Sequence, residues 1–431
     1  MQNDHALIKI GIDDTDSPEG MCTTYVMHKI IQTVLKYGGE LYDFPNLIRL
    51  NPSCPYKTRG NAALSATFRI EAGDEQKFFD AALDRVFELS QINHPKTNPA
   101  LLMLSGNEVP LDIIEFSRNA VKRLLNIESA LTLIKKYNLN GMALNGPRGL
   151  IGALAAIGYD FPSGYTYEII AYRNRDMWGR PRIIDKESVI KMDNLTKDCT
   201  FDNFDYDGEE IKIAPHTPCP VLVGIRSTDH QCLENALRSL KIYEPVSEYR
   251  IFKTNQATDD HIIPVSNIKQ IEPFTSITLE GTVNGLPVTE KGGHTFIYIE
   301  KGGERLRLAA YEPTKQFRKI IMLLRPGDRV RIYGTFKPKE GEPKTINLEK
   351  IQVLEIAQYG KFSNPICPKC GHRMKSEGKE KGYQCPKCKY RMTNLNKEFI
   401  VERRDISTGA FDVPSRARRH LTKPFNLEVR K

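Results

Sequence analysis

The 431-residue sequence lacks a long hydrophobic run, and this absence limits the classes of protein it can be. Its most apolar stretch, residues 150–158, is far shorter than the about 18 residues that a membrane-spanning helix needs. Internal repeats and low-complexity segments are also lacking, and the shares of apolar and charged residues exclude a collagen and a disordered chain. Apolar residues make up 40% and charged residues 27%, so the sequence predicts a globular chain without a membrane partner, of roughly three domains.

Acidic residues are scarce near the C-terminus, whereas basic residues are not. Residues 361–431 hold 18 Lys+Arg and 7 Asp+Glu, a net charge of +11. The first 360 residues hold 44 Lys+Arg and 46 Asp+Glu, a net charge of −2. A basic segment on a near-neutral body favours a nucleic-acid partner, although a solubilising tail has the same composition. The residues expected to contact nucleic-acid phosphates are Arg416, Arg418, Arg419, His420 and Lys423.

Paired cysteines are missing from the first 360 residues. The five cysteines there follow no pattern, so we expect no disulfide framework and a reducing, cytoplasmic compartment. The last four form two Cys-Pro-Lys-Cys pairs, Cys367 with Cys370 and Cys385 with Cys388. Two CxxC pairs at this spacing predict one structural Zn²⁺ with four thiolate ligands. A redox-active pair of dithiols is the alternative.

Two nucleotide-binding signatures are absent. The chain has neither GxxxxGK[ST] nor SGGxDS, which excludes a P-loop NTPase and gives no support to the pyrophosphatase type of ATP-using tRNA ligase. An acidic turn with Asp13, Asp14 and Asp16 instead follows the first predicted strand, residues 6–12. Carboxylates at a strand end suit Mg²⁺ shared with substrate phosphates. An Asx-turn that caps the helix beginning near Thr23 is the alternative.

Cationic residues in two further segments complete a candidate phosphate site. The loop NPSCPYKTRGN (51–61) carries Lys57, Arg59 and Asn61, and PRGLIG (147–152) carries Arg148. Cations opposite an acidic turn are typical of sites that hold ATP phosphates. The glycines of the second segment are equally compatible with close helix packing.

The pattern of elements predicts a multidomain α+β fold. Strands and helices alternate over residues 1–125, which indicates an α/β domain, and residues 126–268 indicate a second, α+β domain. Five β-rich runs separated by glycine turns predict an OB-fold barrel over residues 269–358. Residues 359–431 then form the zinc ribbon with its basic C-terminal tail.

Several motifs together carry a family resemblance. They are GIDDTDSPEGMCTTY (11–25), NPSCPYKTRGN (51–61), KTNPA (96–100), PRGLIGALAAIGYD (147–160), TPCPVLVGIR (217–226), TNQATDDH (254–261), the CPKC pair and RRHLTKP (418–424). In this order, over essentially the whole chain, they resemble the archaeal tRNA-isoleucine 2-agmatinylcytidine synthetase family. The resemblance implies a kinase-like domain, a ferredoxin-like domain, an OB-fold and a zinc ribbon.

The resemblance also implies an ATP-dependent C–N ligase. Such an enzyme conjugates agmatine to C2 of the wobble cytidine in the CAU anticodon of an isoleucine tRNA, so that AUA is decoded as isoleucine. ATP phosphorylates the cytosine O2, and the agmatine amine then attacks C2. No protein partner is implied.

The resemblance and the residues together suggest roles in that reaction. Asp13, Asp14 and Asp16 would hold Mg²⁺ against ATP, with one of them as a possible base, and Thr23 aligns with a self-phosphorylated threonine of the family. Asp259 and Asp260 are the candidates for binding dicationic agmatine. A non-catalytic single-strand binder is the alternative, as is a small-molecule kinase; the first leaves residues 1–265 without a role, and the second leaves the basic tail unexplained.

Overall fold

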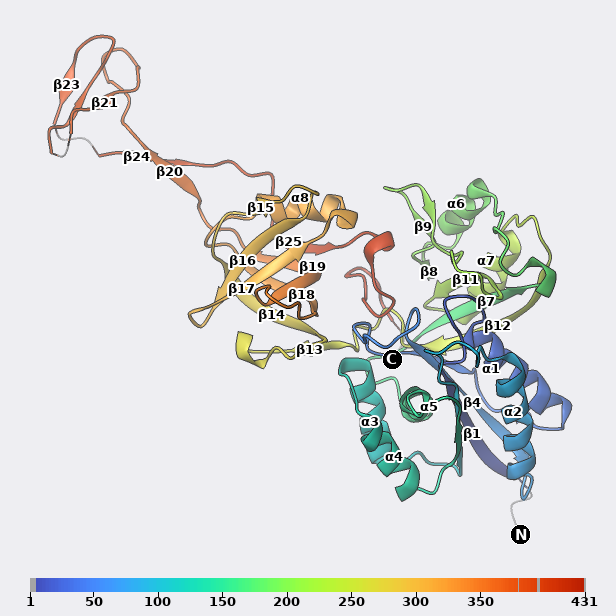
Figure 1. Cartoon of the computed structure of the whole chain (residues 1–431). Helices are drawn as coiled ribbons and strands as arrows, with labels where there is room; N and C mark the ends of the chain where they lie inside the picture. The colour runs from blue at the N-terminus through green and yellow to red at the C-terminus, as the bar shows by residue number, and fades with distance from the viewer. Residues whose placement is uncertain (1–4, 379, 394–395, 430–431) are drawn as a thin grey trace.

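The computed structural model describes residues 5–378, 380–393 and 396–429. An α/β body packs beside a β-barrel, and a small ribbon extends from the barrel on a narrow stalk (Figure 1). No helix in these residues is long and apolar enough to cross a membrane. The multidomain α+β architecture predicted from the sequence is confirmed.

One sheet runs through the whole α/β body. Within the described residues it has ten strands in the order β6-β5-β1-β4-β3-β12-β7-β11-β8, with β2 beside β4. Strands β3 and β12 pair in parallel and join the N-terminal half to the second half. The strands are β1 (His5–Asp13), β2 (Glu40–Leu41), β3 (Asn46–Arg49), β4 (Ala62–Glu71), β5 (Ala100–Ser105), β6 (Asn140–Ala143), β7 (Thr166–Arg173), β8 (Thr200–Phe201), β11 (Val221–Ser227) and β12 (Val246–Thr254).

Helices cover both faces of this sheet, because alternate strand residues point to opposite sides. Ile8, Ile10 and Ile12 of β1 pack in one core with the buried faces of α1 and α2. Gly11, between them, faces α5, where a Cβ would lie 2.4 Å from the Ala153 carbonyl oxygen. The helices of the body are α1 (Thr23–Lys36), α2 (Glu75–Leu89), α3 (Leu111–Lys122), α4 (Ile127–Lys136), α5 (Gly149–Gly158), α6 (Lys186–Leu195) and α7 (Leu233–Ser239), with short turns η1 (Arg175–Met177) and η2 (His230–Cys232).

The second body is the predicted OB-fold barrel. Strands β14, β16, β17, β19 and β18 close on one another through four antiparallel pairs and one parallel pair. Helix α8 covers one end through Phe317 and Ile321. The elements are η3 (Ile268–Gln270), β13 (Ile262–Pro264), β14 (Thr275–Val283), β15 (Val288–Thr289), β16 (Thr295–Lys301), β17 (Glu304–Ala310), η4 (Glu312–Thr314), α8 (Gln316–Leu323), β18 (Arg329–Phe336) and β19 (Thr345–Glu355).

The C-terminal region leaves the barrel and then returns to it. A two-stranded stalk, β20 (Gly360–Ser363) and β24 (Glu398–Val401), carries the ribbon strands β21 (Lys375–Ser376), β22 (Tyr383–Gln384) and β23 (Arg391–Met392) away from the body (Figure 1). Strand β25 (Gly409–Asp412) pairs with β19, and η5 (Ser415–Ala417) follows. The residues after η5 run between the barrel and the α/β body, where Ala257 donates a backbone hydrogen bond to His420. The charge pattern suggested a basic arm on a near-neutral body. The structure instead holds this segment in the body by backbone pairing and packing.

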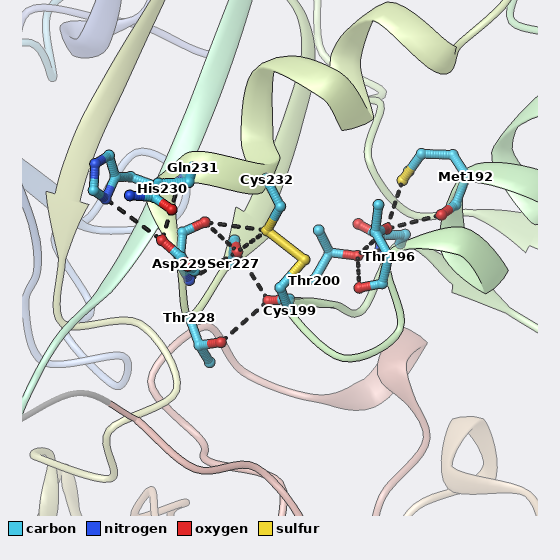
Figure 2. Close-up of a disulfide and its surroundings, with 11 residues drawn as sticks. Met192, Thr196, Cys199, Thr200, Ser227, Thr228, Asp229, His230, Gln231 and Cys232 are labelled. Atoms are coloured by element: carbon cyan, nitrogen blue, oxygen red, sulfur yellow. Dashed lines mark hydrogen bonds and ion pairs between the residues drawn. A yellow bond between two sulfur atoms is a disulfide. The ribbon is translucent and has the colours of Figure 1, made fainter.

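A disulfide joins two of the cysteines that follow no sequence pattern. Cys199 and Cys232 are bonded, with their Cα atoms 6.9 Å apart (Figure 2). The Cys199 carbonyl accepts hydrogen bonds from the Ser227 hydroxyl and the Thr228 amide, each 2.9 Å long. The sequence did not indicate this single bond, because only the fold brings η2 and the loop before β8 together across 33 positions of the chain. The bond fixes η2 to the loop before β8. The hairpin of β9 (Phe204–Asp205) and β10 (Glu210–Ile211) follows in the chain.

Candidate functional site

A cavity of about 400 Å³ lies where the two halves of the body meet the C-terminal segment. The end of β1, the start of α1, the loop after β3, the start of α5, strands β7 and β11, and one residue of the C-terminal segment all contribute to its wall. Of the residues predicted from the sequence, those that line it are Asp13, Asp14, Asp16, Thr23, Lys57, Arg59, Asn61, Arg148 and His420. Segments far apart in the sequence therefore converge on one site.

Asp13 is the most enclosed of the three carboxylates. It ends β1 and lies directly against α5, where a Cβ on Gly152 would be 1.8 Å from its Oδ2 atom. Burial, with the neighbouring Asp14 and Asp16 charges, raises the pKa of Asp13 well above its ordinary value. Gly152 thus allows close helix packing, which was the alternative role for the glycines of this segment. Its lack of a side chain leaves room for the Asp13 carboxylate.

Asp14 is held by neutral donors. Its φ of 55° is in the left-handed region, and its Oδ2 accepts a 3.0 Å hydrogen bond from the Asn98 amide. Burial raises the pKa of Asp14, and the hydrogen bonds from Asn98 oppose that shift. The segment KTNPA, which contains Asn98, therefore supports the acidic turn.

Asp16 forms an ion pair with Arg59, whose Nε is 3.0 Å from its Oδ2. Burial raises the pKa of Asp16 to about 6, against the opposing charge of Arg59. The Nη2 group of Arg59 donates to three backbone carbonyls at 2.6–2.8 Å, those of Ser17, Gly20 and Met21, and its Nη1 group donates to Thr217. The guanidinium therefore holds the acidic loop and the second half of the body together. Because these partners occupy the donors of Arg59, few remain for the phosphate contact predicted for this residue.

The other predicted phosphate ligands differ in how strongly they are already bonded. The Lys57 ammonium donates a 2.6 Å bond to the Pro52 carbonyl, and burial lowers the pKa of Lys57 to about 8. The Asn61 amide donates to the Asn51 carbonyl at 2.8 Å and so closes the loop. Arg148, at the start of α5, stacks on the Tyr56 ring with its guanidinium carbon 3.8 Å from the ring centre.

Thr23 begins α1 beside the acidic turn. It is nearly fully buried, and its hydroxyl accepts a 3.1 Å hydrogen bond from the Thr15 hydroxyl. Thr23 therefore lies at the cavity wall, and its hydroxyl is bonded to the loop that carries the three carboxylates.

Sequence reasoning did not single out several charged residues of the cavity, among them Arg49, Glu168 and Arg226. Arg49 ends β3, Glu168 lies on β7, and Arg226 lies on β11. Glu168 and Arg226 interrupt apolar strands, and a charged residue within such a strand is the signal that could have indicated them. Glu168 is 3.7 Å from the Arg49 guanidinium and accepts a 2.6 Å bond from Gln256.

Asp259 and Asp260 do not line this cavity. Asp259 forms an ion pair with Lys350 of the barrel, and Asp260 accepts a hydrogen bond from the Tyr159 hydroxyl. These contacts join the barrel, the TNQATDDH segment and α5. The structure thus gives both carboxylates partners within the chain and places them outside the site that we describe.

Most of the basic C-terminal residues also have partners within the chain. Arg416 pairs with Asp205, Arg418 with Asp202, and Arg419 with Glu349. Lys423 donates its backbone amide to Asp259. His420 alone among the five lines the cavity. Contacts of these side chains with tRNA remain a prediction.

The four ribbon cysteines converge as predicted. In the described part of the chain, they are the one set of three or more His, Cys, Asp or Glu side chains whose ligand atoms lie within 4.8 Å of one another. Cys367 and Cys388 have their sulfurs 3.5 Å apart, and Cys370 and Cys385 have theirs 3.4 Å apart. Four thiolates at these separations fit a tetrahedral zinc ion with no open position, which is the arrangement of a structural site.

Comparison with known families identifies each part of the chain. The TiaS TCKD domain matches residues 9–146, the TiaS FLD domain residues 147–261, an OB-fold nucleic acid binding domain residues 277–354, and the TiaS C-terminal zinc ribbon domain residues 364–406. With the cavity between the first two parts, these matches define a modular enzyme that carries a nucleic-acid-binding barrel and a zinc ribbon.

Full-length relatives give the family. The chain is 42% identical to the isoleucine-tRNA 2-agmatinylcytidine synthetase TiaS of Archaeoglobus fulgidus, over 98% of both chains. It is 40% identical to a TiaS solved with its isoleucine tRNA and ATP, with a TM-score of 0.90 and coverage of 99% of each chain. It is 38% identical to a TiaS solved with its isoleucine tRNA, AMPCPP and agmatine, with a TM-score of 0.87 and the same coverage. The chain belongs to the TiaS family of isoleucine-tRNA 2-agmatinylcytidine synthetases.

Proposed function

We propose that this chain conjugates agmatine to C2 of the wobble cytidine in an isoleucine tRNA with a CAU anticodon, at the expense of ATP. The observation that carries the proposal is the cavity, which brings the acidic turn and the cations of three distant segments together. A relative solved with its isoleucine tRNA, an ATP analogue and agmatine matches the chain over nearly its full length, which supports the same three ligands here. The product is 2-agmatinylcytidine, and the reaction class is that of an ATP-dependent C–N ligase.

ATP phosphates and Mg²⁺ are assigned to the acidic end of the cavity. Burial raises the pKa of Asp13, Asp14 and Asp16, and neighbouring carboxylates add to the shift at Asp13 and Asp16; a divalent cation would favour the ionised form of all three. Among the described residues, the three carboxylates do not form a preformed cation site. One or two carboxylates of the acidic turn together with substrate phosphates would fit Mg²⁺, which is commonly bound in this way. The ion would neutralise charge on the transferring phosphoryl group.

The chain's own residues then bind and orient the reacting groups. Lys57 and Arg148 are the cations best placed to contact ATP phosphate, while Arg59 and Asn61 hold the loops that carry the site. Transfer of a phosphoryl group to the cytosine O2 makes that oxygen a leaving group. When the agmatine amine attacks C2, the phosphate departs with O2, and one carboxylate of the acidic turn accepts the amine proton.

Dicationic agmatine requires anionic neighbours. Glu168 faces the cavity together with the acidic turn, so these carboxylates are the nearest anions to a ligand bound there. Asp259 and Asp260, proposed from the sequence, would need to exchange their Lys350 and Tyr159 partners to serve this role. Thr23, which faces the same loop, is proposed as a phosphorylated residue, in line with the family.

The tRNA is assigned to the barrel, the ribbon and the basic C-terminal segment. Phosphate contacts by Arg416, Arg418, Arg419, His420 and Lys423 would make tRNA affinity fall steeply with salt. We keep the division into residues 1–125, 126–268, 269–358 and 359–431 as a proposal, and we place the reaction in the cytoplasm, where tRNA is modified.

Incubation of the unmodified tRNA transcript with ATP, Mg²⁺, agmatine and the full chain tests the proposal. The expected result is a tRNA heavier by one agmatine less one water, formed only when ATP and agmatine are both present. A non-catalytic binder would retain the transcript without any gain in mass, and that outcome would reject the proposed activity. A small-molecule kinase would consume ATP without needing the transcript.

A further inference from the structure

Three basic side chains from distant segments meet at one wall of the cavity. Arg49 ends β3, Arg226 lies on β11, and His420 belongs to the C-terminal segment. A Cβ placed on Gly60 would lie 2.6 Å from Arg49 Nη1 and 3.7 Å from His420 Nε2, so both nitrogens face the same point. Gly60 leaves that point open, because it has no side chain.

These groups have fewer partners than their burial calls for. Arg49 Nε and His420 Nδ1 are buried and have no hydrogen-bond partner among the described residues. The side chains of Arg49 and Arg226 are each 14% exposed. Buried donors are normally satisfied, and an unpaired one commonly marks the place of an ion or ligand.

The carboxylates nearby do not balance this charge. Arg49 is 3.7 Å from Glu168, and Arg226 is 3.5 Å from Asp202, both long for hydrogen-bonded pairs. Asp202 also serves Arg418. The Arg49 charge first, and then burial, lower the pKa of His420 well below its usual value, and Arg226 and Lys57 add to the effect. The cluster therefore has unsatisfied donors in a positive field.

We propose that Arg49, Arg226 and His420 form a phosphate-binding subsite of the cavity, separate from the acidic turn. The inference rests on the proposed function, which supplies two phosphate sources: the backbone of the tRNA beside the reacting cytidine and the phosphates of ATP. Planar guanidiniums suit either one, since they pair with phosphate oxygens through two parallel hydrogen bonds. Because His420 comes from the C-terminal segment, this subsite also explains why that segment returns to the body.

Direct binding measurements on the full chain test the subsite. Dissociation constants for the tRNA transcript without ATP, and for ATP without tRNA, are measured at one fixed salt concentration for the wild type, Arg226→Gln and His420→Ala. Arg226→Lys keeps the charge, and Arg238→Gln, on the exposed face of α7, is the matched control. Thermal melting shows that each variant is folded, and His420→Ala provides a second arm if Arg226→Gln does not fold.

The expected result is a loss of about tenfold in affinity for one of the two ligands in Arg226→Gln, the value of one charge-assisted hydrogen-bonded contact. His420→Ala weakens the same ligand, Arg226→Lys restores part of the loss, and Arg238→Gln has no effect. The weakened ligand identifies the source of the phosphate. Unchanged affinity for both ligands in folded Arg226→Gln and His420→Ala would overturn the subsite while leaving the proposed function intact. A wild-type chain that binds neither ligand would overturn both.

Discussion

Gly152 of α5 lies against the carboxylate of Asp13 so closely that no other residue fits there. A Cβ at position 152 would lie 1.8 Å from Asp13 Oδ2 and 2.5 Å from its Cγ. Asp13 ends β1, and the first turn of α5 crosses directly over it. The position of this carboxylate in the cavity is therefore set by the sheet and by the helix together.

Replacement of Gly152 by alanine tests that relationship. The added methyl group must displace either Asp13 or α5, so we expect Gly152→Ala to lose most of its agmatine-conjugating activity while tRNA binding is retained. A misplacement of this size costs on the order of 10²-fold in rate. Gly20→Ala is the matched control in the acidic loop, since its Cβ would meet nothing closer than 3.5 Å. Equal activity of the two variants would show that the Gly152 contact does not position Asp13.

The bonds of Arg59 predict a positioning role. Its guanidinium holds Asp16, three carbonyls of the acidic loop and Thr217. We expect Arg59→Lys, which keeps the charge but loses the fork of donors, to lower the free energy of unfolding by about 2 kcal/mol and to reduce kcat. A direct phosphate ligand would behave differently: the KM for ATP would rise while the melting temperature stayed unchanged.

The pKa of Asp16 predicts a pH dependence of stability. Burial first, then Asp14, raise this pKa from 3.8 to about 6, while Arg59 opposes the shift. The folded state therefore holds a proton that the unfolded state has lost between these two pH values, and the stabilisation is lost as pH rises through about 6. Mg·ATP, which favours the ionised form, should raise the melting temperature more above pH 6 than below it. Asp16→Asn should make the rise in melting temperature given by Mg·ATP the same above and below pH 6. An unchanged pH dependence in Asp16→Asn would mean that another group causes it.

Removal of zinc should unfold the ribbon and leave the rest of the chain folded. The ribbon core contains Cys367, Met374, Tyr383 and Cys385, which is too few buried side chains for a stable fold without metal. Chelation should unfold the ribbon and release about one zinc per chain. The melting of the α/β body and the barrel, which have separate cores, should change little. A purified chain without zinc whose ribbon still resists proteolysis would contradict a structural metal site.

Much of the fold follows from patterns of short range. The regular amphipathic spacing of residues 75–89 predicts a helix, and α2 spans Glu75–Leu89. The strands of the barrel also follow the predicted runs, and the four ribbon cysteines meet as their spacing indicates. In the second half of the body, the sequence predicts a helix from about residue 229 to residue 240, whereas α7 begins only at Leu233, after the turn η2.

The features that the sequence did not indicate depend on contacts of long range. Strand β25 is four residues long, and its pairing with β19 is decided by the path of the chain after the ribbon. The disulfide between Cys199 and Cys232 depends in the same way on the meeting of two loops. In the site, the acidic turn was readable from its density of carboxylates. Arg49 and Arg226 lie on strands from different halves of the body, and only the tertiary fold turns them toward one cavity.

The most direct test of the account is nucleoside analysis of the tRNA after reaction with the wild type and with Asp13→Asn. Asp13→Asn keeps the shape of the side chain and removes its charge. Digestion of the isoleucine transcript incubated with ATP, Mg²⁺ and agmatine should give 2-agmatinylcytidine in place of the wobble cytidine with the wild type. With Asp13→Asn the cytidine should remain, although tRNA binding is retained. Unmodified cytidine with folded wild-type protein, or full conversion by Asp13→Asn, would contradict the proposal that this cavity is the active site.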